Sequence, residues 1–361
     1  MKQVDILVVG AGPAGLCAGI AAAQTGAKVM VIDENLSPGG QLFKQIHKFF
    51  GSREHNAGVR GFDIGNRLLE QTRELGVDVR LGYPVYGILD GSTVLYGTAE
   101  GVKTIKPKRI VIATGANENN LFFPGSTLPG VMTAGAAQTM MNVHHVQPGQ
   151  KVVMIGSGNV GLIVCYQMLQ AGIDVVALVE AAPAIGGYDV HANKLRRAGV
   201  PIYLSHTVKC VEGDGCVERV TLTKLDNFKP VEGTEITLEA DTVCMAVGLT
   251  PMVELAGMAG CRLIESPVLG GVVPAHDEHM QTSQVHIYVA GDVAGVEEAS
   301  TAMEEGRLAG VSAAASLGFI SEEKAQAMCG EIQARLLALR SGHFGQKRAD
   351  AKAKILEDYR S

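Results

Sequence analysis

The stretch VDILVVGAGPAGL, residues 4–16, decides the fold, because an apolar run leads directly into a glycine-rich turn. Residues 4–9 predict a buried strand, and the small residues from about 13 to 25 predict a helix. A second apolar run at 28–33 predicts the next strand. This order of strand, turn, helix and strand is typical of a βαβ unit in a parallel sheet.

The glycines of the turn have the spacing of a dinucleotide-binding site. Gly10 permits the turn, Gly12 lets backbone approach a pyrophosphate, and Gly15 lets the helix pack against the strand. The helix N-terminus offers unpaired N–H groups and partial positive charge to the phosphates. Asp33, 18 residues after Gly15, is placed to accept hydrogen bonds from the adenosine ribose, so strand, helix and acid favour nucleotide binding over a chance turn. The candidate residues of this segment are Gly10, Gly12, Pro13, Ala14, Gly15, Asp33 and Glu34.

The same order of elements recurs between residues 151 and 180. A predicted strand at 151–155 leads into the turn GSGNVG at 156–161, and a helix to about 171 and a strand at 175–179 follow. A Gly-Gly pair follows the acid of each copy by 6 residues. An internal repeat of this length predicts two copies of one nucleotide-binding unit. The candidate residues of the second copy are Gly156, Gly158, Asn159, Val160, Gly161 and Glu180.

The segments around these copies place the second unit inside the first. Residues 77–113 predict short strands, 208–238 an antiparallel excursion, 285–292 a strand ending at a functional turn, and about 297–317 a helix. The sequence therefore predicts an α/β protein of two Rossmann-like, three-layer dinucleotide-binding domains, the second inserted in the first. The predicted parts are 1–125 and 266–320 for the first domain, 126–265 for the inserted domain and 321–361 for a C-terminal helical tail.

The tail has a partial apolar stripe at helical spacing. Its members are Ala325, Met328, Ile332, Leu336 and Leu339. Neither nucleotide site has an obvious use for this stripe. It packs either on its own chain or on a partner, and both alternatives stay open.

Composition excludes several classes of function. With 361 residues, of which 47% are hydrophobic, the chain has apolar material for two cores. A net charge of -6 with both signs interspersed gives no basic field for nucleic acid. No apolar run is long enough for a membrane span. The seven cysteines are odd in number and form no C-x-x-C pair, so we expect free thiols in a reducing cytoplasm.

Other chemistry has little support in the sequence. Cys210 and Cys216 flank a predicted hairpin turn, which favours packing or exposure over a redox pair. His144 and His145 lack acidic or cysteine companions at ligand spacing, and the histidines at 276 and 279 lie in a polar loop. No nucleophile elbow is present. We therefore expect no metal site and assign no catalytic residue.

A further set of motifs resembles the two-dinucleotide-binding-domain flavoproteins, the thioredoxin reductase-like group. The set consists of the first glycine turn and Asp33, GGQ at 39–41, ATG at 113–115 and AGD at 290–292, and it covers residues 1 to about 317. The resemblance implies FAD on the first unit, with the carboxylate of Asp292 on the flavin ribitol and the GGQ segment beside the isoalloxazine ring. It adds the candidates Gly40, Gln41, Ala113, Thr114, Gly115, Gly291 and Asp292.

The same resemblance implies a nicotinamide nucleotide on the second unit. Glu180 would pair with a free 2′-hydroxyl and repel a 2′-phosphate, and residues 181–183 supply no arginine to hold one. NAD(H) is therefore favoured over NADP(H). Two alternatives stay open: the site holds another adenine nucleotide, such as ATP or ADP, or it binds no ligand.

A narrower resemblance concerns FPGSTLPGVMTAGAAQ at 123–138 and SPGGQ at 37–41. These segments look like the alpha subunits of dye-linked proline, hydroxyproline and opine dehydrogenases and of hydrogen cyanide synthase. The likeness implies an electron-transfer subunit whose partner, a second flavoprotein, oxidises an amino or imino acid at its CH–NH group. Many such alpha subunits carry a Cys-rich domain for an iron–sulfur cluster, whereas only Cys329 follows Asp292 here. A cluster would then belong to a separate small subunit of a hetero-oligomer.

Two other functions remain as hypotheses. One is a stand-alone NADH-dependent flavin reductase that acts on a small acceptor. The other is a nucleotide-stabilised scaffold whose flavin site serves assembly only. Neighbouring genes for a second flavoprotein and a small Cys-rich protein would favour the subunit hypothesis.

Overall fold

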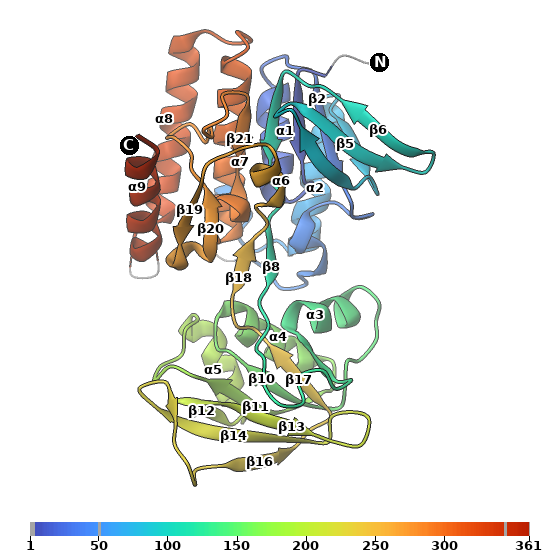
Figure 1. Ribbon diagram of the computed structural model, residues 1–361, viewed down its shortest axis with the longest axis vertical. Coiled ribbons are helices and arrows are strands. Elements are labelled where there is room, and N and C mark those ends of the chain that lie inside the picture. The colour runs from blue at the N-terminus through green and yellow to red at the C-terminus, as the bar shows by residue number, and fades with distance from the viewer. Residues whose placement is uncertain (1–3, 50–51, 343–344, 361) are drawn as a thin grey trace. The chain divides into compact units, whose positions relative to one another are not determined.

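The computed structural model describes residues 4–49, 52–342 and 345–360. The chain divides into two compact units (Figure 1). Unit 1 comprises Met1–Asn117 and Thr250–Ser361, and unit 2 comprises Glu118–Leu249. The second unit is therefore inserted in the first, and the mixed α/β architecture with parallel sheets confirms the predicted fold class.

The chain changes units earlier than the sequence suggests, which placed the borders after residues 125 and 265. Leu121 and Phe123 already pack against the apolar core of unit 2. Helix α6 (Glu254–Met258) contributes Ala256 to the core of unit 1. Long-range apolar packing sets these borders, and a linear sequence does not show it. The crossings use two short paired strands, β8 (Ala116–Glu118) and β18 (Leu249–Pro251).

Unit 1 is built on a parallel sheet of five strands. In spatial order they are β21 (Ile287–Val289), β7 (Arg109–Ile112), β1 (Ile6–Val9), β2 (Val29–Asp33) and β3 (Asp78–Leu81). All residues of β1 and β2 are buried, as expected for central strands of a parallel sheet, which read as continuous apolar runs. Its further described helices are α1 (Pro13–Ala23), α2 (Gly61–Glu74), α7 (Ala299–Ala315), α8 (Glu322–Leu339) and α9 (Gln346–Arg360).

Two antiparallel excursions complete unit 1. One consists of β4 (Val85–Leu89), β5 (Thr93–Thr98) and β6 (Gly101–Ile105), and the other of β19 (Leu263–Ser266) and β20 (Gly271–Pro274). The predicted turn between β4 and β5 has positive φ at both Asp90 and Gly91. Such a turn matches the twist of a hairpin.

The C-terminal tail folds back on its own unit. Helix α8 buries Cys329, Ile332 and Leu336 in the core of unit 1. Helix α9 buries Ile355 in a small cluster with Leu269. Of the two alternatives for the apolar stripe, the structure has the intramolecular one.

Unit 2 repeats the sheet of unit 1. In spatial order its parallel strands are β9 (Val131–Thr133), β17 (Thr242–Met245), β10 (Lys151–Ile155), β11 (Asp174–Glu180) and β12 (Ile202–Leu204). Its described helices are α3 (Ala134–Asn142), α4 (Asn159–Gln170) and α5 (Asp189–Arg197). The internal repeat predicted from sequence therefore corresponds to two parallel sheets with the same spatial order of strands.

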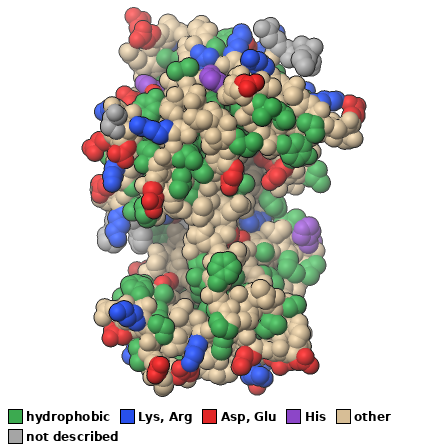
Figure 2. Space-filling model, viewed as in Figure 1, with side chains coloured by type: hydrophobic (Ala, Val, Ile, Leu, Met, Phe, Trp, Pro, Cys, Tyr) green, Lys and Arg blue, Asp and Glu red, His purple; other side chains and the backbone are tan. Residues whose placement is uncertain are grey.

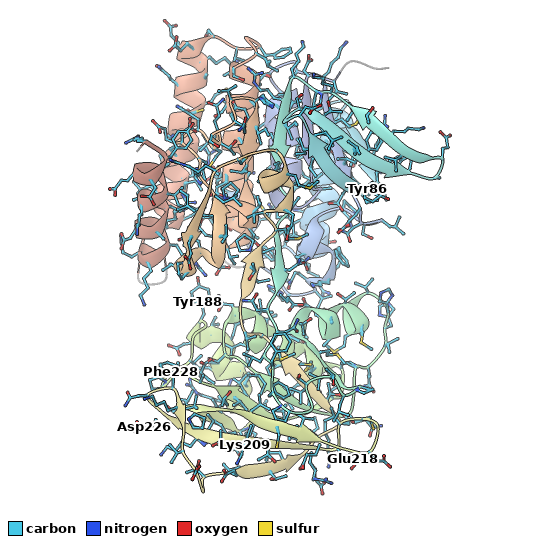
Figure 3. The ribbon with its side chains drawn as sticks, in the orientation of Figure 1. Tyr86, Tyr188, Lys209, Glu218, Asp226 and Phe228 are labelled. Carbon is cyan, nitrogen blue, oxygen red and sulfur yellow. The ribbon has the colours of Figure 1, made fainter. Side chains whose placement is uncertain are left out.

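The predicted antiparallel excursion of unit 2 is also present. It consists of β13 (His206–Glu212), β14 (Arg219–Asp226), β15 (Lys229–Pro230) and β16 (Ile236–Glu239). Asp226 and Phe228 mark the turn from β14 to β15 (Figure 3). Asn227 and Phe228 both have positive φ there.

The molecular surface is mixed in charge. On the face shown in Figure 2, acidic and basic side chains are interspersed among apolar ones, with no broad basic field. Within the described ranges, no helix combines the length and apolar character that a membrane span requires.

Candidate nucleotide-binding sites

The three glycines of the first turn have different surroundings. An added Cβ at Gly10, where φ is +108°, would collide with the carbonyl oxygen of Ala113, and one at Gly15 would collide with that of Gly10. At Gly12 the nearest atom to such a Cβ is the Cα of Gly40, at 3.9 Å. Gly10 and Gly15 are therefore required for packing, whereas Gly12 keeps space open beside the N-terminus of α1. This is the cradle that a pyrophosphate requires.

Asp33 is buried and supports the turn directly. Its Oδ2 accepts a hydrogen bond from Ala11 N at 2.5 Å, and its Oδ1 accepts from Asn35 N at 2.7 Å and from Asn35 Nδ2 at 2.9 Å. A carboxylate has about four lone-pair sites, so acceptor capacity remains for a ribose hydroxyl. The neighbouring Glu34 is exposed, so Asp33 is the acid that supports the turn.

The other motifs of unit 1 converge on this turn. Gly39 N donates to Ala11 O at 2.8 Å, and an added Cβ at Gly40 would lie 2.9 Å from the Cα of Gly12. An added Cβ at Gly291 would lie 2.8 Å from the Cβ of Ala14. The structure thus brings the segments 39–40 and 290–292, which are distant in sequence, against the first glycine turn.

Three of the predicted residues lie less directly on the turn. Gln41 is exposed on the short helix η1 (Gly40–Lys44). The hydroxyl of Thr114 donates to Met252 O at 2.8 Å, and Gly115 O accepts from Met252 N at 2.9 Å. Thr114 and Gly115 therefore hold the chain where it returns to unit 1.

Asp292 lies in the short helix η4 (Gly291–Ala294). Its Oδ1 accepts a hydrogen bond from Glu297 N at 3.4 Å. Burial, with a smaller contribution from the charge of Glu305, raises the pKa of Asp292 to about 7. A carboxyl group with one long hydrogen bond has acceptor capacity to spare, which suits the hydroxyls of a ribitol chain.

The turn of unit 2 repeats the geometry of the first. An added Cβ at Gly156 would collide with Ala246 O, and one at Gly161 with Gly156 O. Nothing lies within 4 Å of an added Cβ at Gly158. The open position again falls on the middle glycine, at the N-terminus of α4. Val160, in the first turn of α4, is 40% exposed.

Glu180 in unit 2 occupies the position that Asp33 occupies in unit 1. Its Oε2 accepts from Ser157 N at 2.9 Å and from Ser157 Oγ at 2.5 Å, and its Oε1 accepts from Ala182 N at 2.8 Å. Tyr188 N donates to Asn159 Oδ1 at 2.9 Å, which fixes the segment after the Gly-Gly pair beside α4 (Figure 3). Glu180 and Asn159 thus both brace the glycine turn.

Sequence reasoning missed a second copy of the ATG motif. Ala246 N donates to Ile155 O at 2.7 Å, just as Ala113 N donates to Val9 O at 2.8 Å. The signal was available, because MAVG at 245–248 matches IATG at 112–115 after an apolar strand. It also missed Ser157, whose hydroxyl binds Glu180.

Three of the buried thiols lie in unreactive environments, whereas Cys210 is half-buried and Cys216 is exposed. Burial raises the pKa of Cys17 to about 11 and that of Cys244 to about 12, and it raises the pKa of Cys165 well above its usual range. Buried thiols with raised pKa values are poor thiolate nucleophiles. The described part of the chain has no group of three or more His, Cys, Asp or Glu residues that could hold a metal ion.

The geometry places the chain in a known family. Residues 4–306 match the pyridine nucleotide-disulphide oxidoreductases, and the chain belongs to that family. It is an FAD-dependent oxidoreductase with a second nucleotide-binding domain. It is 32% identical to the A subunit of the opine oxidase of Rhizobium meliloti (strain 1021), covering 88% of this chain and 72% of its relative. It is 29% identical to HcnB, a hydrogen cyanide synthase subunit of Pseudomonas aeruginosa, covering 85% of this chain and 70% of HcnB.

Solved structures share the fold. Thioredoxin reductase from T. acidophilum superimposes with a TM-score of 0.73 at 22% identity, over 88% of this chain and 99% of that one. L-proline dehydrogenase from P. horikoshii gives a TM-score of 0.70 at 24% identity, over 93% of this chain and 59% of that one. The resemblances that the motifs indicate are thereby confirmed at the level of family and fold.

Proposed function

We propose that this chain is the electron-transfer subunit of an enzyme that oxidises an amino or imino acid, with proline, hydroxyproline and opines as the substrate class. One observation carries the proposal. Unit 1 forms a cradle suited to FAD, yet the cysteines in the described part of the chain form no C-x-x-C pair. Five of the seven are buried, and Cys210 and Cys216 flank the turn of the β13–β14 hairpin in unit 2. Electrons must then pass to or from another molecule.

Specific residues would hold the flavin. Gly12 and the N-terminus of α1 would receive the pyrophosphate, and Asp33 the adenosine ribose. Asp292 would accept hydrogen bonds from the ribitol, with Gly40 and Gln41 beside the ring. Bound FAD supplies two-electron chemistry, and the chain supplies binding, orientation and electrostatics.

The proposed partners are a second flavoprotein and a small iron–sulfur subunit. The relatives support this, since the opine oxidase chain and HcnB are both subunits of their enzymes. Of the residues after Asp292 in this sequence only Cys329 is a cysteine, and it is buried, so this segment offers no set of cluster ligands. All seven cysteines are free, which supports a reducing cytoplasm as the location.

A second candidate function has support in unit 2. The open space at Gly158 and the braced acid at Glu180 suit NAD(H). A stand-alone NADH-dependent flavin reductase would use both sites. Rapid flavin reduction by NADH in the isolated chain would favour that candidate.

Affinity purification from the native host tests the subunit proposal. The isolated chain and the purified complex are assayed with a secondary amine or amino acid and an artificial electron acceptor. We expect turnover by the complex and little by the isolated chain. An isolated homodimer that turns over the substrate at the rate of the native extract would contradict the proposal.

A further inference from the structure

Two adjacent glutamates of α7 are buried and pair with cations from the tail, although Glu304 also contacts His55 and Arg307 of unit 1. Glu304 is 0% exposed and Glu305 is 2% exposed. Arg335 of α8 pairs with Glu304 at 3.0 Å, and Lys352 of α9 pairs with Glu305 at 2.8 Å. A buried carboxylate without a partner is strongly unfavourable. The tail therefore neutralises charge that unit 1 has buried.

Glu305 connects the tail to the loop that contains Asp292. Its Oε1 accepts from Lys352 Nζ at 2.8 Å and from Arg340 Nη2 at 2.5 Å. Its Oε2 accepts from Gly291 N at 3.0 Å. One carboxylate thus joins two tail cations to the first residue of η4.

Lys352 also binds the other end of the same short helix. Its Nζ donates to Ala294 O at 2.9 Å, and its side chain is 5% exposed. Glu305 and Lys352 thus hold the first amide and the last carbonyl of η4, with Asp292 between them. Because Gly291 packs tightly on Ala14, a shift of η4 would also disturb its fit to α1.

Arg340 adds a second connection. Its Nε and Nη2 bind both carboxylate oxygens of Glu297 at 2.7 to 3.1 Å. Glu297 N in turn donates to Asp292 Oδ1. A bidentate guanidinium–carboxylate pair fixes orientation as well as distance.

We propose that Lys352 and Arg340 are positioning residues of the FAD site, which hold Asp292 in place through Glu305 and Glu297. The inference rests on the proposed binding of FAD to unit 1. A merely structural tail would need only its apolar contacts and neutralised charges. Here the hydrogen bonds from Glu305 and Lys352 reach backbone atoms at both ends of η4. The tail therefore sets the position of the loop itself.

The chain offers two matched controls. Lys354 lies on α9, two residues from Lys352, and is exposed. Arg335 lies on α8 and pairs with Glu304 of α7 and with Glu54, rather than with the glutamate that binds η4. Lys354→Met controls for a change on the same helix, and Arg335→Met controls for the loss of a tail ion pair.

Two measurements on the full-length chain test the proposal. FAD affinity is measured by fluorescence titration, and amide hydrogen exchange is followed in the peptide that covers 287–295. Lys352→Met should weaken FAD binding about tenfold or more and speed exchange in this peptide, because a buried ion pair has been broken. Lys354→Met should change neither, and Arg335→Met should leave exchange in the peptide unchanged. Lys352→Arg should restore part of the affinity.

The outcomes separate this inference from the function on which it rests. If Lys352→Met fails to fold, the double variant Glu305→Gln/Lys352→Met is used instead, because it leaves no unpaired charge at this position. Amide exchange at η4 should again be faster than in the wild type. Unchanged exchange in the peptide would overturn the inference even if FAD binds. Faster exchange with unchanged FAD affinity would also overturn it, while leaving FAD binding in place. A wild-type chain that binds no FAD would contradict the proposed function, and the exchange experiment would still decide whether the tail holds η4.

Discussion

The two units have sheets of the same spatial order but reach it by different chain orders. In unit 1 the outer strand β21 and helix α7 follow the other strands of the sheet in sequence, whereas in unit 2 their counterparts, β9 and α3, precede the other strands. Strand β9 ends at Thr133 and α3 begins at Ala134. Between β21 and α7, by contrast, lies the loop 290–298 that contains Asp292. The loop that we propose contacts the flavin is thus an elaboration of one connection in a shared scaffold.

The turns differ in how the acid is held. In unit 1 the position after the first glycine is Ala11, which offers only its amide to Asp33. In unit 2 it is Ser157, which offers an amide and a hydroxyl to Glu180. Each acid therefore braces its turn, and we propose that each also accepts from the ribose of a bound nucleotide. The glycine turn of the second unit donates two hydrogen bonds to its acid and that of the first donates one, while each acid accepts three in all.

The largest expected effect comes from removing the tail, on which only unit 1 depends. Deletion of residues 321–361 strips Glu305 of both its cations, at a cost of about 3–5 kcal/mol, whereas Glu304 loses Arg335 but keeps Arg307. We expect unit 1 to lose FAD and its cooperative unfolding transition. Denaturant titration, followed by flavin absorbance and far-ultraviolet circular dichroism, measures this. Retention of full FAD occupancy would show that the tail is dispensable to the site.

Acid should affect unit 1 through Glu305. Burial would raise the pKa of this group, but Lys352 and Arg340 outweigh it and hold the pKa at about 2, below the usual 4.5. The stabilisation is therefore present above about pH 4.5 and is lost as the pH falls toward 2. Glu305→Gln should reduce the loss of unfolding free energy between pH 7 and pH 3 by about 2 kcal/mol, because part of the titration lies below pH 3. An unchanged slope would mean that other carboxylates dominate.

The smallest expected effect concerns nucleotide choice in unit 2. Wild-type flavin should be reduced by NADH rather than NADPH in anaerobic stopped-flow mixing, if this domain is catalytic. Glu180→Gln removes the charge that repels a 2′-phosphate and should narrow the preference about tenfold. Faster reduction of the wild type by NADPH would refute this role of Glu180. Absence of reduction by either nucleotide would favour a bound but non-catalytic adenine nucleotide.

Much of this architecture was predictable because it depends on short-range patterns. The glycine turns, the acids Asp33 and Glu180, and the apolar strands are local signals, and the repeat reinforced them. The unit borders were not predictable, because Leu121 and Ala256 are assigned by long-range packing. The network around Glu305 was not predictable for the same reason. Acidic and basic residues on an amphipathic helix predict a solvent-exposed face, and only the packing of the helices shows that these residues are buried.

The central claim is that FAD binds at the turn of unit 1, and flavin content tests it most directly. The wild type, Gly12→Val and Gly158→Val are purified with ample FAD, and flavin released on denaturation is measured for each mole of protein. An added Cβ makes only an ordinary contact with Gly40 at Gly12 and meets nothing within 4 Å at Gly158, so neither valine should unfold its unit. We predict flavin in the wild type and in Gly158→Val, and its loss from Gly12→Val. A wild-type protein without flavin that cannot be reconstituted, or flavin lost only from Gly158→Val, would contradict the account.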